Sequence, residues 1–149
     1  MKTRLQIDEV EPKGYQSLFG LEKYLQQSEL TSTHKELIKI RASQINKCAF
    51  CIDMHTKDAL KQGEKTQRIL LLNAWRETDL FTPEEKILLQ ITEEITLISE
   101  KGLSEECYNK ALKAFGENYL AQVILAIIAI NAWNRLSVST NKPIPNESI

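Results

Sequence analysis

Apolar residues recur every three or four positions along most of the chain, which is the spacing of amphipathic helices. The clearest example follows Thr82-Pro83-Glu84-Glu85, where threonine, proline and glutamate stand as they do at a helix N-terminus. The apolar face of that helix runs Ile87, Leu88, Ile91, Ile95 and Ile98, and Gly102 ends the unit. Because such patterns cover nearly the whole chain, the predicted fold class is all-α.

The other helices are placed by the same spacing and by their start and stop residues. Thr33-x-x-Glu36 has the spacing of a capping box, and Gly63 is a typical C-terminal stop. The predicted helices run from about Gly14 to Gln27, Thr33 to Asn46, Cys48 to Gln62, Thr66 to Trp75, and Ser104 to Gly116. The last, Asn118 to Leu136, is apolar almost all round, so we expect it at the centre of a compact bundle. The tail from Ser137 to Ile149 has two prolines and no periodicity, which predicts irregular structure.

Length and charge narrow the class of protein. A chain of 149 residues favours a single domain, here 1–149 with its core at about 10–140. The net charge of −1 provides no basic face for nucleic acid or an anionic membrane. Met1 to Val10 has no apolar signal segment, and Ala121 to Trp133 is shorter than the ~20 residues that span a bilayer. We therefore expect a cytoplasmic protein that binds neither nucleic acid nor a membrane.

Two of the three cysteines form a C-x-x-C pair, which in a reducing compartment is typical of a catalytic or metal-binding site. Cys48 and Cys51 stand three positions apart at the predicted start of a helix, which places both sulfurs on one face, close enough to bridge. The positive end of the helix dipole favours the thiolate over the thiol. This placement predicts reactive sulfur at neutral pH.

His55 and Glu36 add acid–base chemistry to the pair. His55 follows Cys51 by four residues, so it lies on the same helical face one turn away. If the two helices form an antiparallel hairpin that turns at Asn46-Lys47, Glu36 comes within one turn of His55. A carboxylate there would orient the imidazole, as the third group of an activated nucleophile does.

Simpler interpretations stay open for each residue taken alone. The cysteines could be buried or form half of a metal site, His55 could be a structural histidine, and Glu36 could serve only in the capping box. A metal-binding module that uses all four residues is one rival hypothesis, and a redox-sensing or assembly protein without peroxide turnover is another. Cys107 has no histidine or second cysteine near it and is expected to be a packing or surface cysteine.

Three further predictions concern residues outside the pair. His34 has no helical-face relation to the cysteines and is expected at the surface. Trp75 and Trp133 are expected at helix contacts. Arg76 and Arg135 are expected to pair with acidic residues or to line a subunit contact.

The segment from Glu36 to His55 resembles the core motif of the alkylhydroperoxidase D-like proteins, which belong to the carboxymuconolactone decarboxylase superfamily. It has a glutamate, eleven residues, C-x-x-C, three residues and a histidine. Asn73 to Glu77, Phe81 to Lys86 and Asn131 to Leu136 also resemble the family, so the similarity covers roughly residues 10 to 140.

The resemblance implies an all-helical fold that assembles into homo-oligomers and acts as a thiol peroxidase on hydroperoxides, with an external dithiol as reductant and no metal or organic cofactor. Carried over by position, Cys51 is the peroxidatic cysteine, Cys48 its partner and proton donor, and His55 with Glu36 the proton relay. The decarboxylase branch lacks the C-x-x-C pair, which argues against that reaction. Alkylhydroperoxidase D itself has a histidine where this chain has Phe50, and it has a second half-repeat that this chain lacks.

Overall fold

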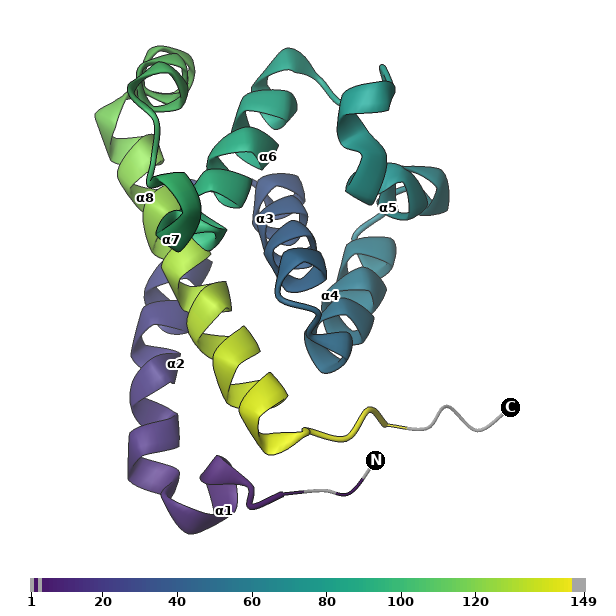
Figure 1. Cartoon of the computed structure of the whole chain (residues 1–149), viewed down its shortest axis with the longest axis vertical. Coiled ribbons are helices and arrows are strands. Elements are labelled where there is room, and N and C mark those ends of the chain that lie inside the picture. Colours follow the sequence, from purple (N-terminus) through teal and green to yellow (C-terminus); the bar gives the residue numbers. More distant parts are fainter. Residues whose placement is uncertain (1, 3, 146–149) are drawn as a thin grey trace.

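The structure, a computed structural model, describes residues 2 and 4–145, and every regular element in these ranges is a helix (Figure 1). This confirms the all-α prediction. The elements are α1 (Ile7–Val10), α2 (Pro12–Gln26), α3 (Ser32–Ile45), α4 (Ala49–Lys61), α5 (Thr66–Leu71), the 3₁₀ helix η1 (Leu72–Glu77), α6 (Pro83–Thr96), α7 (Ile98–Lys101) and α8 (Glu105–Thr140).

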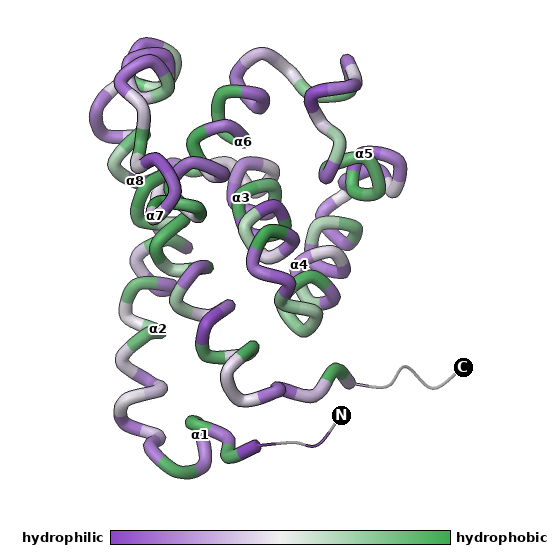
Figure 2. Tube along the Cα trace, viewed as in Figure 1, coloured by the Kyte–Doolittle hydropathy of each residue, from purple (hydrophilic) through white to green (hydrophobic). Residues whose placement is uncertain are grey.

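The bundle is organised around α3, which packs against α4, α6 and α8 (Figure 1). Apolar stretches run along α3, α6 and α8, whereas α2 covers one side of α8 (Figure 2). The largest fully buried aliphatic side chains come from these three helices and the start of η1: Ile38, Ile40, Leu72, Leu88, Leu89, Ile91, Val123, Ile127 and Ile130. Each such side chain stabilises the fold by ~1.5–3 kcal/mol relative to an exposed one.

The start of α3 differs from the prediction. Thr31, not Thr33, is the N-cap, and its hydroxyl accepts a hydrogen bond from the His34 N–H at 3.1 Å. The predicted capping box of Thr33 and Glu36 is therefore wrong. Two nearby threonines are equivalent local signals, and only the packing of the helix selects one. Glu36 therefore makes no capping hydrogen bond, and its side chain is buried against α4.

The helix that starts at Thr82 has the predicted N-cap, and Thr82 and Glu85 also form a capping box. The Glu85 N–H donates to the Thr82 hydroxyl at 3.2 Å, and the Thr82 N–H donates to the Glu85 carboxylate at 2.8 Å. The unit divides at Leu97 into α6 and α7, whereas the sequence predicts one helix to Gly102. The predicted helix over Thr66 to Trp75 is also shared between two elements, because it continues as the 3₁₀ helix η1.

α8 combines two predicted helices and is longer than expected. The break predicted at Gly116 is a kink, with φ 72° and ψ 169° at that glycine. The irregular tail predicted from Ser137 is wrong for Ser137 to Thr140, which are helical. The N-terminal segment explains the extension, because the Arg4 N–H and the Gln6 side chain donate to the Thr140 carbonyl at 3.3 and 3.1 Å. Exposed helix ends lack such partners for their last carbonyls.

Within the described ranges, α8 is the one helix long and apolar enough, by length and composition, to cross a bilayer. Its buried side chains pack on α3, α6 and α2. A core helix that supplies much of a bundle interior passes the same length and composition test. The packing therefore accounts for the apolar character of α8.

Candidate active site

The turn between α3 and α4 places Cys48 at the N-terminus of α4. Lys47 has φ 55°, in the left-handed region, and Cys48 is the N-cap residue. The Cys48 sulfur accepts a hydrogen bond from the Cys51 N–H at 3.3 Å. A sulfur in this position faces the unpaired N–H groups of the first helical turn, which stabilise negative charge. The local geometry therefore favours thiolate chemistry at the pair.

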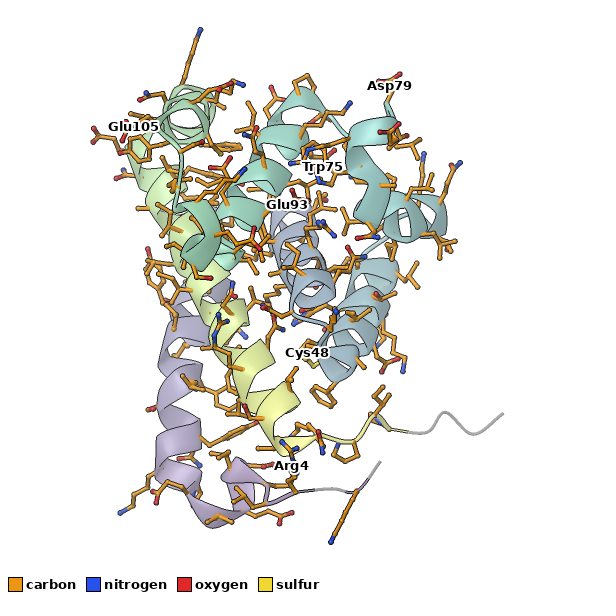
Figure 3. All side chains as sticks on the ribbon, viewed as in Figure 1. Arg4, Cys48, Trp75, Asp79, Glu93 and Glu105 are labelled. Carbon is orange, nitrogen blue, oxygen red and sulfur yellow. A yellow bond between two sulfur atoms is a disulfide. The ribbon has the colours of Figure 1, made fainter. Side chains whose placement is uncertain are left out.

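Cys48 and Cys51 are joined by a disulfide, and their Cα atoms lie 5.4 Å apart. Figure 3 shows Cys48 at the start of α4. Each cysteine is only 1% exposed. The expectation that helical spacing brings the two sulfurs within bonding reach is confirmed.

His55 and Glu36 meet between α4 and α3. His55 Nδ1 lies 3.1 Å from Glu36 Oε2, and the two residues are 6% and 8% exposed. The antiparallel hairpin of α3 and α4 produces this contact, as predicted from a turn at Asn46-Lys47. Because Nδ1 is bonded to the carboxylate, Nε2 is the ring nitrogen left for exchange with a reacting group.

An apolar cavity of about 290 Å³, called the aromatic cavity below, opens beside Cys51 and His55. Its wall includes Cys51 but not Cys48, so the two sulfurs are not equivalent toward an incoming molecule. Side chains from α2, α4 and α8 form its apolar lining: Tyr15, Phe19, Phe50, Met54, Trp133 and Leu136. Such a cavity binds an apolar body next to a small number of polar groups.

Three charged side chains also line this cavity. Glu22 pairs with Lys39 at 3.6 Å and accepts a hydrogen bond from Trp133 Nε1 at 3.1 Å. Lys142, from the segment after α8, pairs with Asp8 at 3.3 Å and lies over the rings of Tyr15 and Phe50. Each of the three charges therefore has a partner of opposite sign, and the apolar surface remains for a ligand.

Glu36 lines a second cavity, of about 530 Å³, between α3, the end of α4, α5 and the start of α6. Oε2 of Glu36 faces His55, and the Glu36 side chain is 10% exposed. The Glu36–His55 pair connects the aromatic cavity, which His55 lines, with this second, polar one.

Cys107 and His34 lie outside the cysteine pair. Cys107 is buried, and burial raises the pKa of its thiol to about 12, with Glu94 acting in the same direction. It is thus a packing cysteine, and its place at a helix start does not activate it. His34, expected at the surface, is partly buried: Nδ1 lies 2.7 Å from the Tyr119 hydroxyl, and burial lowers the His34 pKa.

The tryptophans and arginines also have partners. Trp75 is buried and donates to Glu93 at 2.8 Å, and Arg76 pairs with the same carboxylate at 2.6 Å. Arg135 donates to Asn131 rather than to an acidic residue. Trp133 lies at a helix contact, as expected, and also lines the aromatic cavity, which the sequence did not indicate.

The described side chains include no group of three or more histidine, cysteine, aspartate or glutamate residues arranged to hold a metal ion. The four candidate residues are already paired. A disulfide joins Cys48 to Cys51, and a hydrogen bond joins the His55 imidazole to the Glu36 carboxylate. This arrangement fits thiol redox chemistry and does not support the metal-binding hypothesis.

Comparison with known proteins agrees with this geometry. An uncharacterized protein of Bacillus subtilis, YdfG, is 46% identical over 139 residues, which are 93% of this chain and 95% of the relative. A crystal structure from Agrobacterium tumefaciens superposes with a TM-score of 0.95 at 36% identity, covering 98% of this chain and all of that one. That protein has no established function, and its suggested role is that of the antioxidant defence protein AhpD.

A third relative shares the fold alone. An uncharacterized peroxidase-related protein from Silicibacter superposes with a TM-score of 0.77 at 20% identity, covering 88% of this chain and 69% of that one. The model of the carboxymuconolactone decarboxylase family matches residues 12–94, which include α3, α4 and the four candidate residues Glu36, Cys48, Cys51 and His55. The chain therefore belongs to the carboxymuconolactone decarboxylase family, with an alkylhydroperoxidase D-like fold.

Proposed function

We propose that this protein is a thiol peroxidase that reduces organic hydroperoxides and serves in antioxidant defence. One observation carries the proposal: Cys51 lines an apolar cavity together with His55, whose other ring nitrogen is bonded to a buried carboxylate. A reactive thiol, a base and a group that orients the base are the elements of an activated nucleophile. The suggested role of the Agrobacterium relative points the same way.

In the first step of the proposed cycle the Cys51 thiolate attacks the terminal oxygen of the hydroperoxide. The O–O bond breaks, and Cys51 becomes a sulfenic acid. His55 holds the proton that Cys51 gave up and delivers it to the leaving alkoxide, which departs as an alcohol. Glu36 keeps the imidazole oriented during both transfers. Cys51 has this role rather than Cys48 because only Cys51 lines the cavity.

In the second step Cys48 attacks the sulfenic sulfur of Cys51. The S–O bond breaks, a disulfide forms, and the Cys48 proton leaves with the hydroxide as water. An external dithiol then reduces the disulfide by two thiol exchanges and is itself oxidised. The cycle requires no metal or organic cofactor. Because it depends on a reducing environment, we place the protein in the cytoplasm, and we propose that it works as a homo-oligomer.

The test is hydroperoxide consumption by the full chain with a panel of dithiol reductants. We expect turnover in wild type and in Cys107→Ser, and none in Cys51→Ser. A redox sensor would form the disulfide with one equivalent of peroxide but show no turnover with any reductant. That result would contradict the peroxidase proposal.

A further inference from the structure

A buried polar cluster lies where α8 crosses the turn that carries Cys48. Asn134 of α8 and Ser43 of α3 are both fully buried. The Asn134 amide donates to the Ser43 hydroxyl at 2.9 Å, and its oxygen accepts from the Asn46 amide at 2.9 Å. Asn134 therefore ties α8 both to the last turn of α3 and to its C-cap residue, Asn46.

The cluster extends to a third helix. The Asn46 amide also donates to Asn131 Oδ1 at 3.0 Å, and Asn131 donates to the Thr96 hydroxyl of α6 at 3.1 Å. Arg135 donates to the same Asn131 oxygen at 2.8 Å. Asn131, Asn134 and Arg135 thus belong to one hydrogen-bonded cluster. It links α8 to α6 and to the α3–α4 turn.

This link continues into the redox pair. The Cys48 N–H donates to the Ser43 carbonyl at 3.0 Å, so Ser43 contacts Asn134 through its side chain and Cys48 through its backbone. Between them Lys47 has φ 55°, a conformation that residues other than glycine seldom adopt. The turn has no glycine to relieve this strain, and local backbone bonds hold it: the Lys47 N–H donates to the Gln44 carbonyl at 3.2 Å, beside the Cys48–Ser43 bond. The contacts of Ser43 and Asn46 with Asn134 add tertiary support to the same turn.

Such a cluster serves specificity more than stability. A buried amide or hydroxyl must replace its hydrogen bonds to water, so a satisfied polar cluster adds little net stability over well-packed apolar side chains. Its partners, however, accept only one arrangement. We propose that Asn134 is a positioning residue for the redox pair: with Ser43 and Asn46 it holds the Lys47 turn so that the Cys48 sulfur stays within reach of Cys51. This inference rests on the redox role proposed above.

The two cysteines depend on the cluster to different degrees. Cys51 lies inside α4, whereas Cys48 is the N-cap at the end of the turn. A loosened turn leaves the attack of Cys51 on peroxide nearly unchanged but displaces the sulfur that must resolve the sulfenic acid. Disulfide formation slows, and the Cys51 sulfenic acid persists long enough to be trapped or oxidised further to the sulfinic acid.

The experiment uses Asn134→Leu in the full chain, which keeps the volume of the side chain and removes its hydrogen bonds. Reduced protein receives one equivalent of hydrogen peroxide with dimedone, and mass spectrometry measures the Cys51 adduct. We expect roughly tenfold more adduct than in wild type, since displacements near 1 Å slow reactions by such factors or more. The Cys48–Cys51 reduction potential, measured against dithiothreitol, is expected to become less negative, because a disordered turn favours the open dithiol.

The matched control is Thr92→Val. Thr92 is also fully buried, and its hydroxyl donates only to the Leu88 carbonyl, at 2.7 Å. This variant loses a buried hydrogen bond that is not part of the cluster, so its adduct yield and potential are expected to equal those of wild type. Should Asn134→Leu not fold, Ser43→Ala removes one bond of the cluster and is tested in the same way.

A folded Asn134→Leu or Ser43→Ala protein with wild-type potential and wild-type adduct yield would overturn the proposal. The potential requires only dithiothreitol and no peroxidase activity. Wild-type protein that fails to react with peroxide would therefore refute the proposed function, while the potentials of the variants would still decide the positioning role.

Discussion

Nδ1 of His55 lies 3.1 Å from Oε2 of Glu36, although nineteen positions separate the two residues along the chain. Both side chains are buried, and Glu36 is the only carboxylate on α3. His55 lines the cavity with Cys51, and Glu36 lines a different cavity. The contact gives the imidazole a fixed orientation and leaves Nε2 free of the carboxylate, and Nε2 is the nitrogen that we propose serves the Cys51 thiol.

If His55 is the base for Cys51, His55→Gln is expected to slow alkylation of reduced Cys51 near neutral pH by roughly 10²–10⁴-fold. Glu36→Gln is expected to slow it as well, yet to add little once His55 is absent, since groups that act as a unit are non-additive. The glutamine leaves the Thr31 cap of α3 untouched. The measurement is the pH dependence of alkylation in both single variants and the double variant.

His34→Gln is the matched control, because His34 is the chain's other histidine, is partly buried and is bonded to Tyr119. Its Cys51 reactivity is expected to equal that of wild type. Fully additive losses from the two relay substitutions would show independent roles, and unchanged reactivity in His55→Gln would leave the N-terminus of α4 as the main activator.

Mild peroxide is expected to remove two of the three thiols and to spare Cys107. The Cys48–Cys51 pair is already within bonding distance, whereas burial raises the pKa of Cys107 to about 12 and keeps it a thiol. Thiol titration and peptide mass mapping measure the outcome. A disulfide that includes Cys107 would contradict this assignment, and Cys107→Ser provides the control because its peroxide response is expected to be unchanged.

The aromatic cavity is expected to select organic hydroperoxides. Phe50→Ala removes one apolar wall while leaving the relay in place, so kcat/KM for cumene hydroperoxide should fall by about tenfold more than kcat/KM for hydrogen peroxide, as lost apolar contacts do. Tyr24→Ala is the control, since Tyr24 is an exposed aromatic residue of α2 outside the cavity. Equal losses for both peroxides would mean that the cavity does not bind the organic group.

The α3–α4 hairpin was predictable because helical spacing fixes which residues share a face, and two antiparallel helices then pair by position. The aromatic cavity was not predictable in this way. Trp133 of α8 contacts Tyr15 and Phe19 of α2, more than a hundred positions away, and neither helix signals the other locally. The end of α8 escaped prediction for the same reason, since Arg4 and Gln6 complete its last carbonyls.

We expect the protein to form a homo-oligomer in solution. Ile128 of α8 is 48% exposed and Leu70 of α5 is 74% exposed, so the bundle leaves large apolar side chains uncovered. Association of copies is a common way to bury such residues. Light scattering at micromolar concentration is the measurement, and a mass of 17.1 kDa, that of one chain, would show the prediction to be wrong.

The last prediction concerns Glu93 of α6, whose carboxylate contacts residues of α3 and η1. Figure 3 labels Glu93 and its partner Trp75. The Glu93 carboxylate accepts hydrogen bonds from Arg41 at 2.8 Å, Trp75 at 2.8 Å and Arg76 at 2.6 Å. Burial alone would raise the pKa of Glu93, but these three partners outweigh it and hold the pKa below its ordinary value. Because the pKa is lower in the folded state, the stabilisation is complete above the unfolded-state pKa, near ~4.3, and is lost as pH falls toward the folded-state value.

Glu93→Gln is therefore expected to lower the free energy of unfolding at pH 7 by about 1.5–3 kcal/mol, the range for hydrogen bonds to a charged group. The measurement is urea denaturation of wild type and variant at pH 7 and at pH 3, and the difference between them should shrink at the lower pH. Glu106→Gln is the control, because the Glu106 side chain is 76% exposed and pairs only with Lys110, so little change is expected at either pH. A difference between wild type and Glu93→Gln that stays constant with pH would show that the lost stability comes from packing rather than from the ionised carboxylate.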